Sequence, residues 1–231
     1  MKRYSSCIIV FASLLILTAS AQAETNYRFE LYGSGNLPID KSFEIGPPQS
    51  TVPLEGEHQF SLGVRGGVRF GVDGSGHWGQ DISYSYGTNA TKIVVVPNGE
   101  FAFTHRTHQF AYNAVFYPGG LRAKKMYPYV TAGAGGTIFT LSQAAINEGM
   151  MRGLGKLETH TSFTFNVGGG VRYQFNNGCG IRVDVRDWMS HPPRYGIGAE
   201  SNDPDAFVFP VKGIFQQIEF SLGFVYVFGS K

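Results

Sequence analysis

The sequence predicts an all-β fold, an eight-stranded antiparallel up-and-down transmembrane β-barrel. Three observations favour this fold: large apolar residues alternate with small or polar ones along eight segments, a secretion signal precedes them, and long and short connections alternate between them. Successive side chains of a strand point to opposite faces, so each segment has one apolar face and one polar face. Lipid-facing and lumen-facing residues alternate in this way in membrane barrels, where short periplasmic turns oppose longer outer loops.

Residues 1–23 have the features of a cleaved signal peptide. Lys2-Arg3 forms a positive start, Ile8–Thr18 is an uncharged apolar run, and Ala21-Gln22-Ala23 offers small residues where a signal peptidase cuts. The apolar run is too short for a membrane helix, which needs about 20 residues. We therefore expect residues 1–23 to be a signal peptide and residues 24–231 to form the barrel.

The composition excludes several classes of protein. Loss of Lys2 and Arg3 with the signal lowers the basic count from 19 to 17, equal to the 17 acidic residues. A neutral chain argues against binding of nucleic acid. Cys179 is the only cysteine after the signal, which excludes an internal disulfide framework and a multi-cysteine metal site. We expect no cofactor.

The eight predicted strands share the alternating pattern. In chain order they are Asn26–Gly33, Phe60–Phe70, Trp78–Tyr86, His108–Tyr117, Tyr127–Leu141, Ser162–Phe175, Gly180–Trp188 and Ile218–Phe228.

The first four strands show the pattern with different polar residues on the inner face. In the first, the apolar side reads Tyr-x-Phe-x-Leu. In the second, apolar residues alternate with Arg65 and Arg69. The third places Asp81 opposite its aromatic face, and the fourth places Gln109 and Asn113 there. Arginines on the inner side of a lipid-facing strand need a polar interior.

The last four strands repeat the pattern. The fifth alternates valine and alanine with threonine and glycine, and the sixth has Arg172 on its polar face. In the seventh, Arg182, Asp184 and Arg186 face inward against valines and an isoleucine. The eighth is the clearest, because every second residue is large and apolar while Glu219 lies on the opposite face.

We expect the inner faces to form a lumen charge network. Its predicted members are Arg65, Arg69, Asp81, Arg172, Arg182, Asp184, Arg186 and Glu219. Buried charges are stable only when paired and hydrogen-bonded, so we expect Glu219 and Asp184 to pair with neighbouring arginines. Eight strands enclose a space just wide enough for side chains to fill. A plugged interior is the main interpretation, and a narrow polar conduit gated by these pairs is the alternative.

We expect the outer faces to contact lipid. The predicted lipid-facing and girdle residues are Trp78, Tyr84, Phe116, Tyr173, Phe220, Phe224, Tyr226 and Phe228. Trp78, Tyr117, Tyr127 and Tyr173 are expected to form an interfacial girdle at the periplasmic end. A soluble lipocalin-like barrel, the rival fold, would reverse the two faces.

Four long connections alternate with three short ones. The long ones are residues 34–57, 88–106, 142–161 and 190–212, and the short ones are 72–76, 118–126 and Asn176-Asn177-Gly178. We expect the long ones to be exposed extracellular loops. The uncharged stretch Met126–Asn147 is long enough for a membrane helix, but Pro128 and its glycines favour a strand.

Four segments carry a resemblance to a known family. They are YPYVTAGAGGTIF (Tyr127–Phe139), FTFNVGGGVRYQF (Phe163–Phe175), GIRVDVRDW (Gly180–Trp188) and the aromatic last strand. The chain resembles the small outer-membrane β-barrel proteins: the OmpA-like transmembrane domain and its opacity-protein and OmpW relatives. The resemblance implies a porin-like protein of the bacterial outer membrane, in contact with lipid and lipopolysaccharide. It also implies insertion by the barrel-assembly machinery, and we expect a monomer. The family usually ends on an aromatic residue, whereas Gly229-Ser230-Lys231 follows Phe228 here.

One motif raises the question of an enzymatic function. His160 and Ser162 lie two residues apart, hence on one strand face, and resemble the His-x-Ser of outer-membrane lipid A deacylases. A nucleophilic serine needs a base and a third group to orient that base. Position 174 is Gln174 and no acid occurs between Ser162 and Asp184, so we interpret His160 as a loop-edge residue.

The candidates for metal binding are weak. His105 and His108 are three apart, which points them to opposite faces of a strand. Glu200, Asp203 and Asp205 could hold a divalent cation beside lipopolysaccharide, although a solvated acidic loop is the default interpretation. The glycine clusters lack the lysine of a phosphate-binding loop, and they are expected to let strands bend or to leave room for lumen side chains.

Three functions remain for comparison. The main hypothesis is a non-enzymatic integral outer-membrane protein with a structural or surface-contact role for its long loops. The alternative is a narrow channel or carrier for small or hydrophobic solutes. A lipid A-modifying hydrolase is the third.

Overall fold

The computed structural model describes nine parts of the chain. They are residues 25–39, 44–45, 56–74, 76–95, 99–121, 125–151, 156–175, 178–198 and 213–229, of which 44–45, 56–60, 91–95 and 99–103 are described as backbone only. The predicted signal peptide, residues 1–23, lies outside the described residues.

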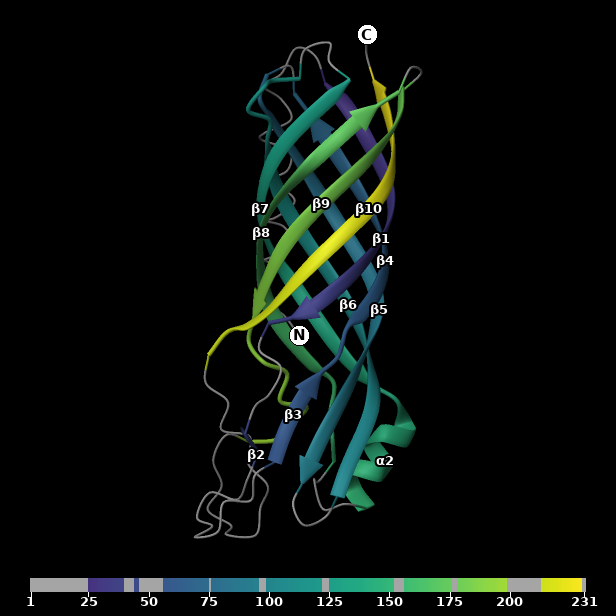
Figure 1. The fold of residues 1–231 in the computed structure, drawn as a ribbon, viewed down its shortest axis with the longest axis vertical. Helices are drawn as coiled ribbons and strands as arrows, with labels where there is room; N and C mark the ends of the chain where they lie inside the picture. The colour runs from purple at the N-terminus through teal and green to yellow at the C-terminus, as the bar shows by residue number, and fades with distance from the viewer. Residues whose placement is uncertain are drawn as a thin grey trace, which may run out of the picture.

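Eight strands form a closed antiparallel barrel (Figure 1). They are β1 (Asn26–Pro38), β4 (Gly63–Asp73), β5 (Trp78–Val95), β6 (Gly99–Phe116), β7 (Met126–Leu141), β8 (His160–Gln174), β9 (Cys179–Ser190) and β10 (Phe215–Gly229). Each strand pairs with the next barrel strand in the chain, and β10 pairs with β1 from Asn26↔Gly229 to Pro38↔Gln217, which closes the ring. The predicted fold class is confirmed.

The alternating residues place apolar side chains outside and polar ones inside. Along β10, Phe220 and Phe224 are 51% and 54% exposed, whereas Glu219 on the inner face of the same strand is fully buried. The same inside-out order holds on β4, where Val68 and Phe70 are exposed and Arg69 is buried. The rival soluble barrel, which needs the reverse order, is therefore wrong.

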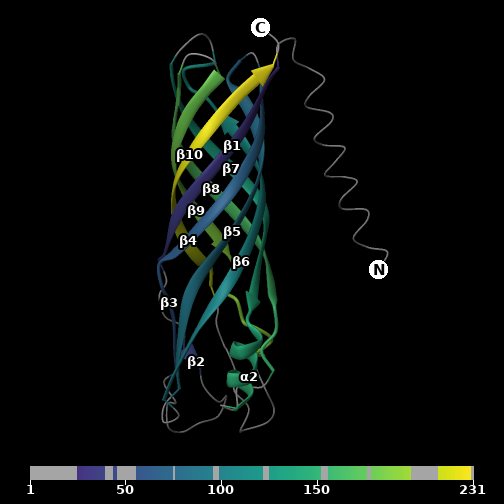
Figure 2. The same cartoon turned by 90° about the vertical axis from the view of Figure 1, so that its right-hand side faces the viewer.

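The two ends of the barrel differ. At one end, here called the turn end, short connections join the strands, and the first residues of β1 lie beside the last residues of β10 (Figures 1 and 2). Backbone hydrogen bonds close these turns, as from Phe175 N to Cys179 O (2.7 Å) and from Gly74 N to Trp78 O (3.1 Å). The opposite end, here called the loop end, carries the long connections.

At the loop end, the sequence interpretation underestimated regular structure. Strands β5 and β6 have 18 residues each, so the predicted loop 88–106 is mostly a hairpin that continues both strands. Two short strands, β2 (Glu44–Ile45) and β3 (Gly56–Phe60), lie at the predicted loop 34–57, and β3 pairs with β5. Helix α2 (Gln143–Met151) lies within the predicted loop 142–161.

The helix interpretation of Met126–Asn147 is wrong for most of that stretch, because Met126–Leu141 forms strand β7 between β6 and β8. In the described part of the chain, helices that are both long and apolar enough to cross a membrane are absent.

Candidate functional site

The interior of the barrel holds a network of buried charges. Six arginines and five carboxylates point inward and are almost fully buried. They are Arg28, Arg65, Arg69, Arg172, Arg182, Arg186, Glu30, Asp73, Asp81, Asp184 and Glu219. All eight residues proposed from the sequence as a lumen charge network belong to this set, and the structure adds Arg28, Glu30 and Asp73.

Asp184 on β9 lies at the centre of the network. Its carboxylate oxygens lie 2.9 Å from Arg69, 3.2 Å from Arg182 and 3.1 Å from Arg186. The hydroxyl of Tyr129 donates a hydrogen bond of 2.9 Å to the same carboxylate. Strands β4, β7 and β9 thus meet at one carboxylate in the middle of the barrel.

Glu30 on β1, two strands from Asp184 around the ring, pairs with two of the same arginines. Its carboxylate oxygens lie 2.6 Å from Arg69 and 3.2 Å from Arg182. Arg69 on β4 and Arg182 on β9 each bridge Glu30 and Asp184, so charged side chains connect β4 with β9, three strands away around the ring. Charge-assisted hydrogen bonds of this kind are shorter and stronger than neutral ones.

The network continues toward the turn end. Asp73 lies 3.1 Å from Arg28 and 2.7 Å from Arg172, and Asp81 lies 3.6 Å from Arg28 and 3.4 Å from Arg182. Arg28 also donates to the hydroxyl of Tyr117. The ion pairs therefore form one continuous chain from the centre of the barrel to its turn end.

Toward the loop end, the network becomes less charged. Glu219 lies 3.6 Å from Arg65 and 3.9 Å from Arg69. Arg65 also donates to the amide oxygens of Gln109 (2.8 Å) and Gln217 (2.7 Å). The hydrogen bonds of this buried guanidinium are therefore made partly to neutral amides.

Tyrosines fill the space around the arginines. Arg69 stacks over the ring of Tyr32 at 3.8 Å and Arg182 over Tyr129 at 4.3 Å. Tyr117 and Tyr127 were predicted to lie in the outer girdle, but they are only 1% and 7% exposed and line the interior. Tyr127 has the same parity as the inward Tyr129, and the pleat of β7 therefore sends both inward.

Glycines on the inner face make room for these side chains. A Cβ atom on Gly67 would lie 2.6 Å from the ring of Tyr32, and one on Gly223 would lie 2.4 Å from the carboxylate of Glu30. At Gly133 it would lie 2.1 Å from the side chain of Asn113. The inner glycines are therefore positions where a longer side chain of a neighbouring strand fills the lumen.

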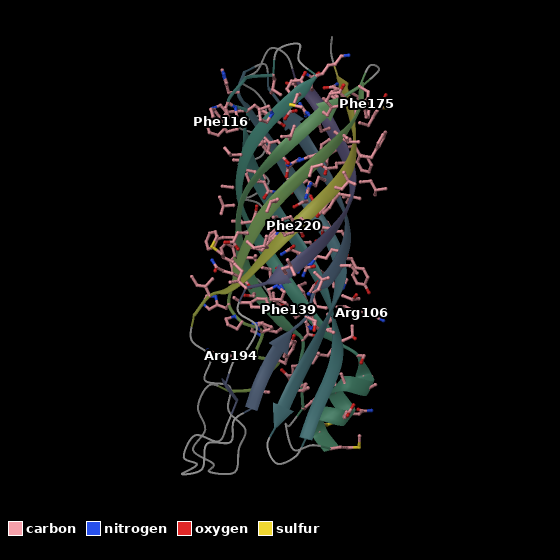
Figure 3. The ribbon with its side chains drawn as sticks, in the orientation of Figure 1. Arg106, Phe116, Phe139, Phe175, Arg194 and Phe220 are labelled. Carbon is pink, nitrogen blue, oxygen red and sulfur yellow. The ribbon has the colours of Figure 1, made fainter. Side chains whose placement is uncertain are left out.

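The predicted lipid-facing residues lie on the outside of the barrel. Trp78, Tyr84, Phe220, Phe224, Tyr226 and Phe228 are exposed, and Phe116 and Tyr173 are half-buried. At the turn end, the ring of Tyr27 stacks on Phe228 at 5.8 Å, and Trp78 packs on Phe116 at 4.9 Å. Figure 3 shows Phe116 and Phe175 projecting outward at this end.

Aromatic side chains fill the loop-end mouth of the barrel. Tyr195, in the segment after β9, is 2% exposed and adopts a positive φ of 50°, unusual for a residue other than glycine. Its ring lies 6.1 Å from His105, which lies 5.7 Å from Phe139 (labelled in Figure 3). The segment from 191 to 198, predicted to be exposed loop, thus folds partly into the barrel.

The His-x-Ser motif does not form a catalytic triad. The Ser162 hydroxyl accepts a hydrogen bond from His191 N (3.1 Å) and lies 3.3 Å from His191 O, so it anchors the segment after β9. Within the described residues, no hydrogen bond or ion pair joins His160 or Ser162 to a carboxylate. The serine therefore has a positioning role for the backbone.

The candidate metal ligands are separated or lie elsewhere. His105 is buried inside the barrel, whereas His108 is half-buried on the outer face. In the described ranges, no group of three or more histidine, cysteine, aspartate or glutamate side chains could hold one metal ion. Glu200, Asp203 and Asp205 lie outside the described residues.

Comparisons with known proteins bear on the fold and the family. A family model described as "Outer membrane protein beta-barrel domain" matches residues 9–228. The outer membrane protein OprG from Pseudomonas aeruginosa is similar in structure, with a TM-score of 0.63 and 13% identity over 90% of this chain and 98% of that chain. No curated protein sequence matches the chain.

Two further solved structures are similar at lower scores. The outer membrane protein AlkL, solved in DMPC lipid bilayers, has a TM-score of 0.49 and 14% identity over 91% of this chain and 93% of that chain. The attachment invasion locus protein Ail of Yersinia pestis, solved with the heparin analogue sucrose octasulfate, has a TM-score of 0.47 and 11% identity over 89% of this chain and 99% of that chain.

Proposed function

Because the chain belongs to the outer membrane protein β-barrel domain family, we propose that it is a non-enzymatic protein that anchors a surface-contact platform in the bacterial outer membrane. The platform is the part of the loop end built by β3, residues 91–95 and 99–104 of the β5–β6 hairpin, and α2. The barrel serves as its membrane anchor.

The observation that carries this proposal is the filled interior. Arg182 on β9 reaches Asp81 on the opposite strand β5, Arg69 on β4 reaches Asp184 on β9, and Tyr195 and His105 lie at the loop-end mouth. Ions would have to break these pairs to pass, and breaking a buried pair costs several kcal/mol. The arrangement supports a structural anchor in preference to an open pore.

The platform supports the surface-contact part of the proposal. Figure 1 shows the ends of β5 and β6 extending well beyond the barrel, with β3 on one side and α2 near β6. Strand β3 pairs with β5 from Glu57↔Val94 to Phe60↔Thr91, and with β2, so a sheet of β2, β3, β5 and β6 continues outside the ring. Hydrogen-bonded structure of this kind presents a preformed surface to a partner.

Planar-bilayer conductance tests the anchor against the channel. We expect purified wild-type protein to show no steady open conductance, and the double variant Arg69→Ala, Arg182→Ala to conduct, because it removes both guanidiniums that cross the lumen. Arg106→Ala, which removes an exposed arginine on the outside of β6, is the matched control and should stay closed. A steady conductance in the wild-type protein would overturn the plugged anchor.

A narrow channel or carrier for small solutes is the second candidate, and one observation favours it. Both carboxylate oxygens of Glu219 and both terminal nitrogens of Arg186 are buried without a hydrogen-bond partner among the described residues. Buried polar atoms are normally satisfied by protein or by ordered water, so a wet interior would meet this need. Swelling of protein-loaded liposomes in small sugars or amino acids tests this candidate, since the plugged barrel predicts no swelling.

The lipid A-modifying hydrolase has the least support, because Ser162 is engaged with the backbone of His191. Mass spectrometry of lipid A from cells with and without the gene tests it. Identical lipid A in both strains is the result that we expect.

A further inference from the structure

A pocket of about 520 Å³ lies at the loop end, apart from the lumen charge network. It is lined by the first residues of β8, the segment after β9 and Gly213 before β10. The lining residues that matter here are His160, Phe163, His191 and Arg194. Figure 3 labels Arg194 at this end, in the segment after β9.

The polar lining suits an anion. Arg194 contributes a guanidinium, and His160 and His191 contribute two imidazoles. Among the described residues that line the pocket, none is acidic. A planar guanidinium with several N–H donors matches the oxygens of a phosphate group, and imidazole N–H groups add further donors.

The pocket is held by hydrogen bonds that fix both of its walls. The Ser162 hydroxyl accepts from His191 N at 3.1 Å, and Glu158 N donates to Tyr195 O at 2.8 Å. The buried ring of Tyr195 then anchors the chain next to Arg194, and Ile197 N donates to Arg194 O at 2.9 Å in a turn. A preformed site of this kind loses little conformational freedom on binding.

The pocket also borders the lipid-facing surface. Phe163, on its wall, is 58% exposed and packs edge-on against the exposed Phe165 at 4.9 Å. These two rings begin the apolar outer stripe of β8, which continues with Val167 and Val171. A ligand with an anionic head and acyl chains would therefore contact the polar lining and the apolar stripe together.

We propose that this pocket binds the phosphate group of a phosphorylated, acylated sugar in the outer leaflet, the headgroup chemistry of lipopolysaccharide. Arg194 and His191 hold the phosphate, His160 donates from the strand side, and Phe163 contacts the first acyl chain. The bound lipid joins the start of β8 to the segment after β9.

Native mass spectrometry of the full-length protein in detergent, titrated with diphosphorylated lipid A, tests this site. We expect one tightly bound lipid, and the double variant His191→Gln, Arg194→Gln should weaken its binding by about tenfold or more, since two charge-assisted contacts are lost. Arg106→Gln is the matched control, because Arg106 is also exposed near the loop end but lies on the other side of the barrel in Figure 3. Heat-modifiable gel mobility verifies that each variant is folded.

Further measurements distinguish the contribution of the phosphate group to binding from that of the acyl chains. Phe163→Ala should weaken lipid A binding but leave binding of glucosamine 1-phosphate unchanged. Wild-type affinity in the double variant, equal weakening by Arg106→Gln, or equal binding of dephosphorylated lipid A would each overturn the proposal. Displacement of lipid A by an equal concentration of inorganic phosphate would assign the pocket to free phosphate and overturn the lipid as its ligand.

Discussion

At the scale of single residues, burial of charge is the dominant feature of the barrel. Asp184 faces three guanidiniums and a tyrosine hydroxyl in a space almost closed to solvent. Such a group costs much free energy to desolvate, and only its partners make the position stable. The strength of the network therefore depends on each member being present.

Asp184→Asn should destabilise the barrel strongly, because it leaves Arg69, Arg182 and Arg186 with less compensating charge. Breaking a buried pair typically costs about 3–5 kcal/mol. Urea unfolding in phospholipid vesicles measures the effect. Asp187→Asn is the matched control: Asp187 lies on the outer side of the same strand, where its carboxylate accepts from Gln216, and we expect a change below about 1 kcal/mol there. Equal losses in the two variants would contradict a special role for the interior carboxylate.

The same scale shows what the sequence could and could not predict. Parity along the strands placed Arg182, Asp184 and Glu219 on the inner face, and the same parity would have found Arg28 and Glu30 beside the outward Tyr27 and Phe29. The particular ion pairs could not be predicted without the geometry of the barrel, since Asp184 and Arg69 are 115 positions apart in the sequence. Tyr195 could not be predicted, because no periodic pattern marks a loop residue that turns into the mouth.

At the scale of elements, inner and outer positions of one strand obey different packing rules. Gly66 and Gly67 on β4 are neighbours in the chain, but they face opposite sides. A Cβ at Gly67 would lie 2.6 Å from both the ring of Tyr32 and the backbone oxygen of Tyr84, whereas a Cβ at Gly66 meets nothing within 4 Å. The inner face at Gly67 therefore has no room for a further side-chain atom, whereas the outer face at Gly66 does.

Gly67→Ala should lower the free energy of unfolding by about 1–3 kcal/mol, the usual cost of overpacking. Gly66→Ala should change it by less than about 0.5 kcal/mol, as is usual for surface positions. Urea unfolding of both variants under one condition provides the comparison. Similar stabilities for the two would show that the inner face tolerates a methyl group and would contradict the close packing around Tyr32.

The β5–β6 hairpin is the element that the sequence interpretation assigned least well. Its continuous strands reach Val95 and restart at Gly99. The Pro97-Asn98-Gly99 sequence between two runs of apolar residues is a turn signal that would have indicated a hairpin. Alternation alone did not extend the strands, because Ile93 to Val96 are apolar on both faces.

Replacing residues 91–103 by Asn-Gly should leave the barrel folded, because Ala90 pairs with Thr104 and the pairing of β6 with β7 begins only at His105. We expect the shortened protein to keep its heat-modifiable gel mobility. The removed residues include every β5 position that pairs with β3, so the platform should lose its contact with a partner surface. Binding of cells that express either form to host or matrix surfaces measures this loss. Failure of the shortened chain to fold would show that the barrel depends on the hairpin for its stability and would contradict the separation of anchor and platform.

At the scale of the whole molecule, the usual distribution of side chains is reversed, with apolar side chains outside and charged side chains inside. Each of its eight barrel strands exposes large apolar side chains on the outer face, and its interior holds six arginines and five carboxylates. Such a surface is stable only in lipid, where every backbone group must also be paired, and the closed ring provides that pairing. The two tryptophans of the chain report on the two sides, since Trp78 is 58% exposed on the outside and Trp188 is 3% exposed on the inside.

Brominated lipids should therefore quench Trp78 and spare Trp188. In vesicles, the variant Trp188→Phe, which retains only Trp78, should lose much of its fluorescence when bromine is placed on the acyl chains. The variant Trp78→Phe, which retains only Trp188, should be nearly unaffected, because bromine quenches at contact and Trp188 is enclosed by the barrel wall. Bromine positions along the chain add the depth of Trp78, which lies at the turn end beside Phe116 and should be quenched most by bromines near the headgroup. Stronger quenching of Trp188 than of Trp78 would contradict the placement of the apolar face against lipid, and with it the location of the charge network in the lumen.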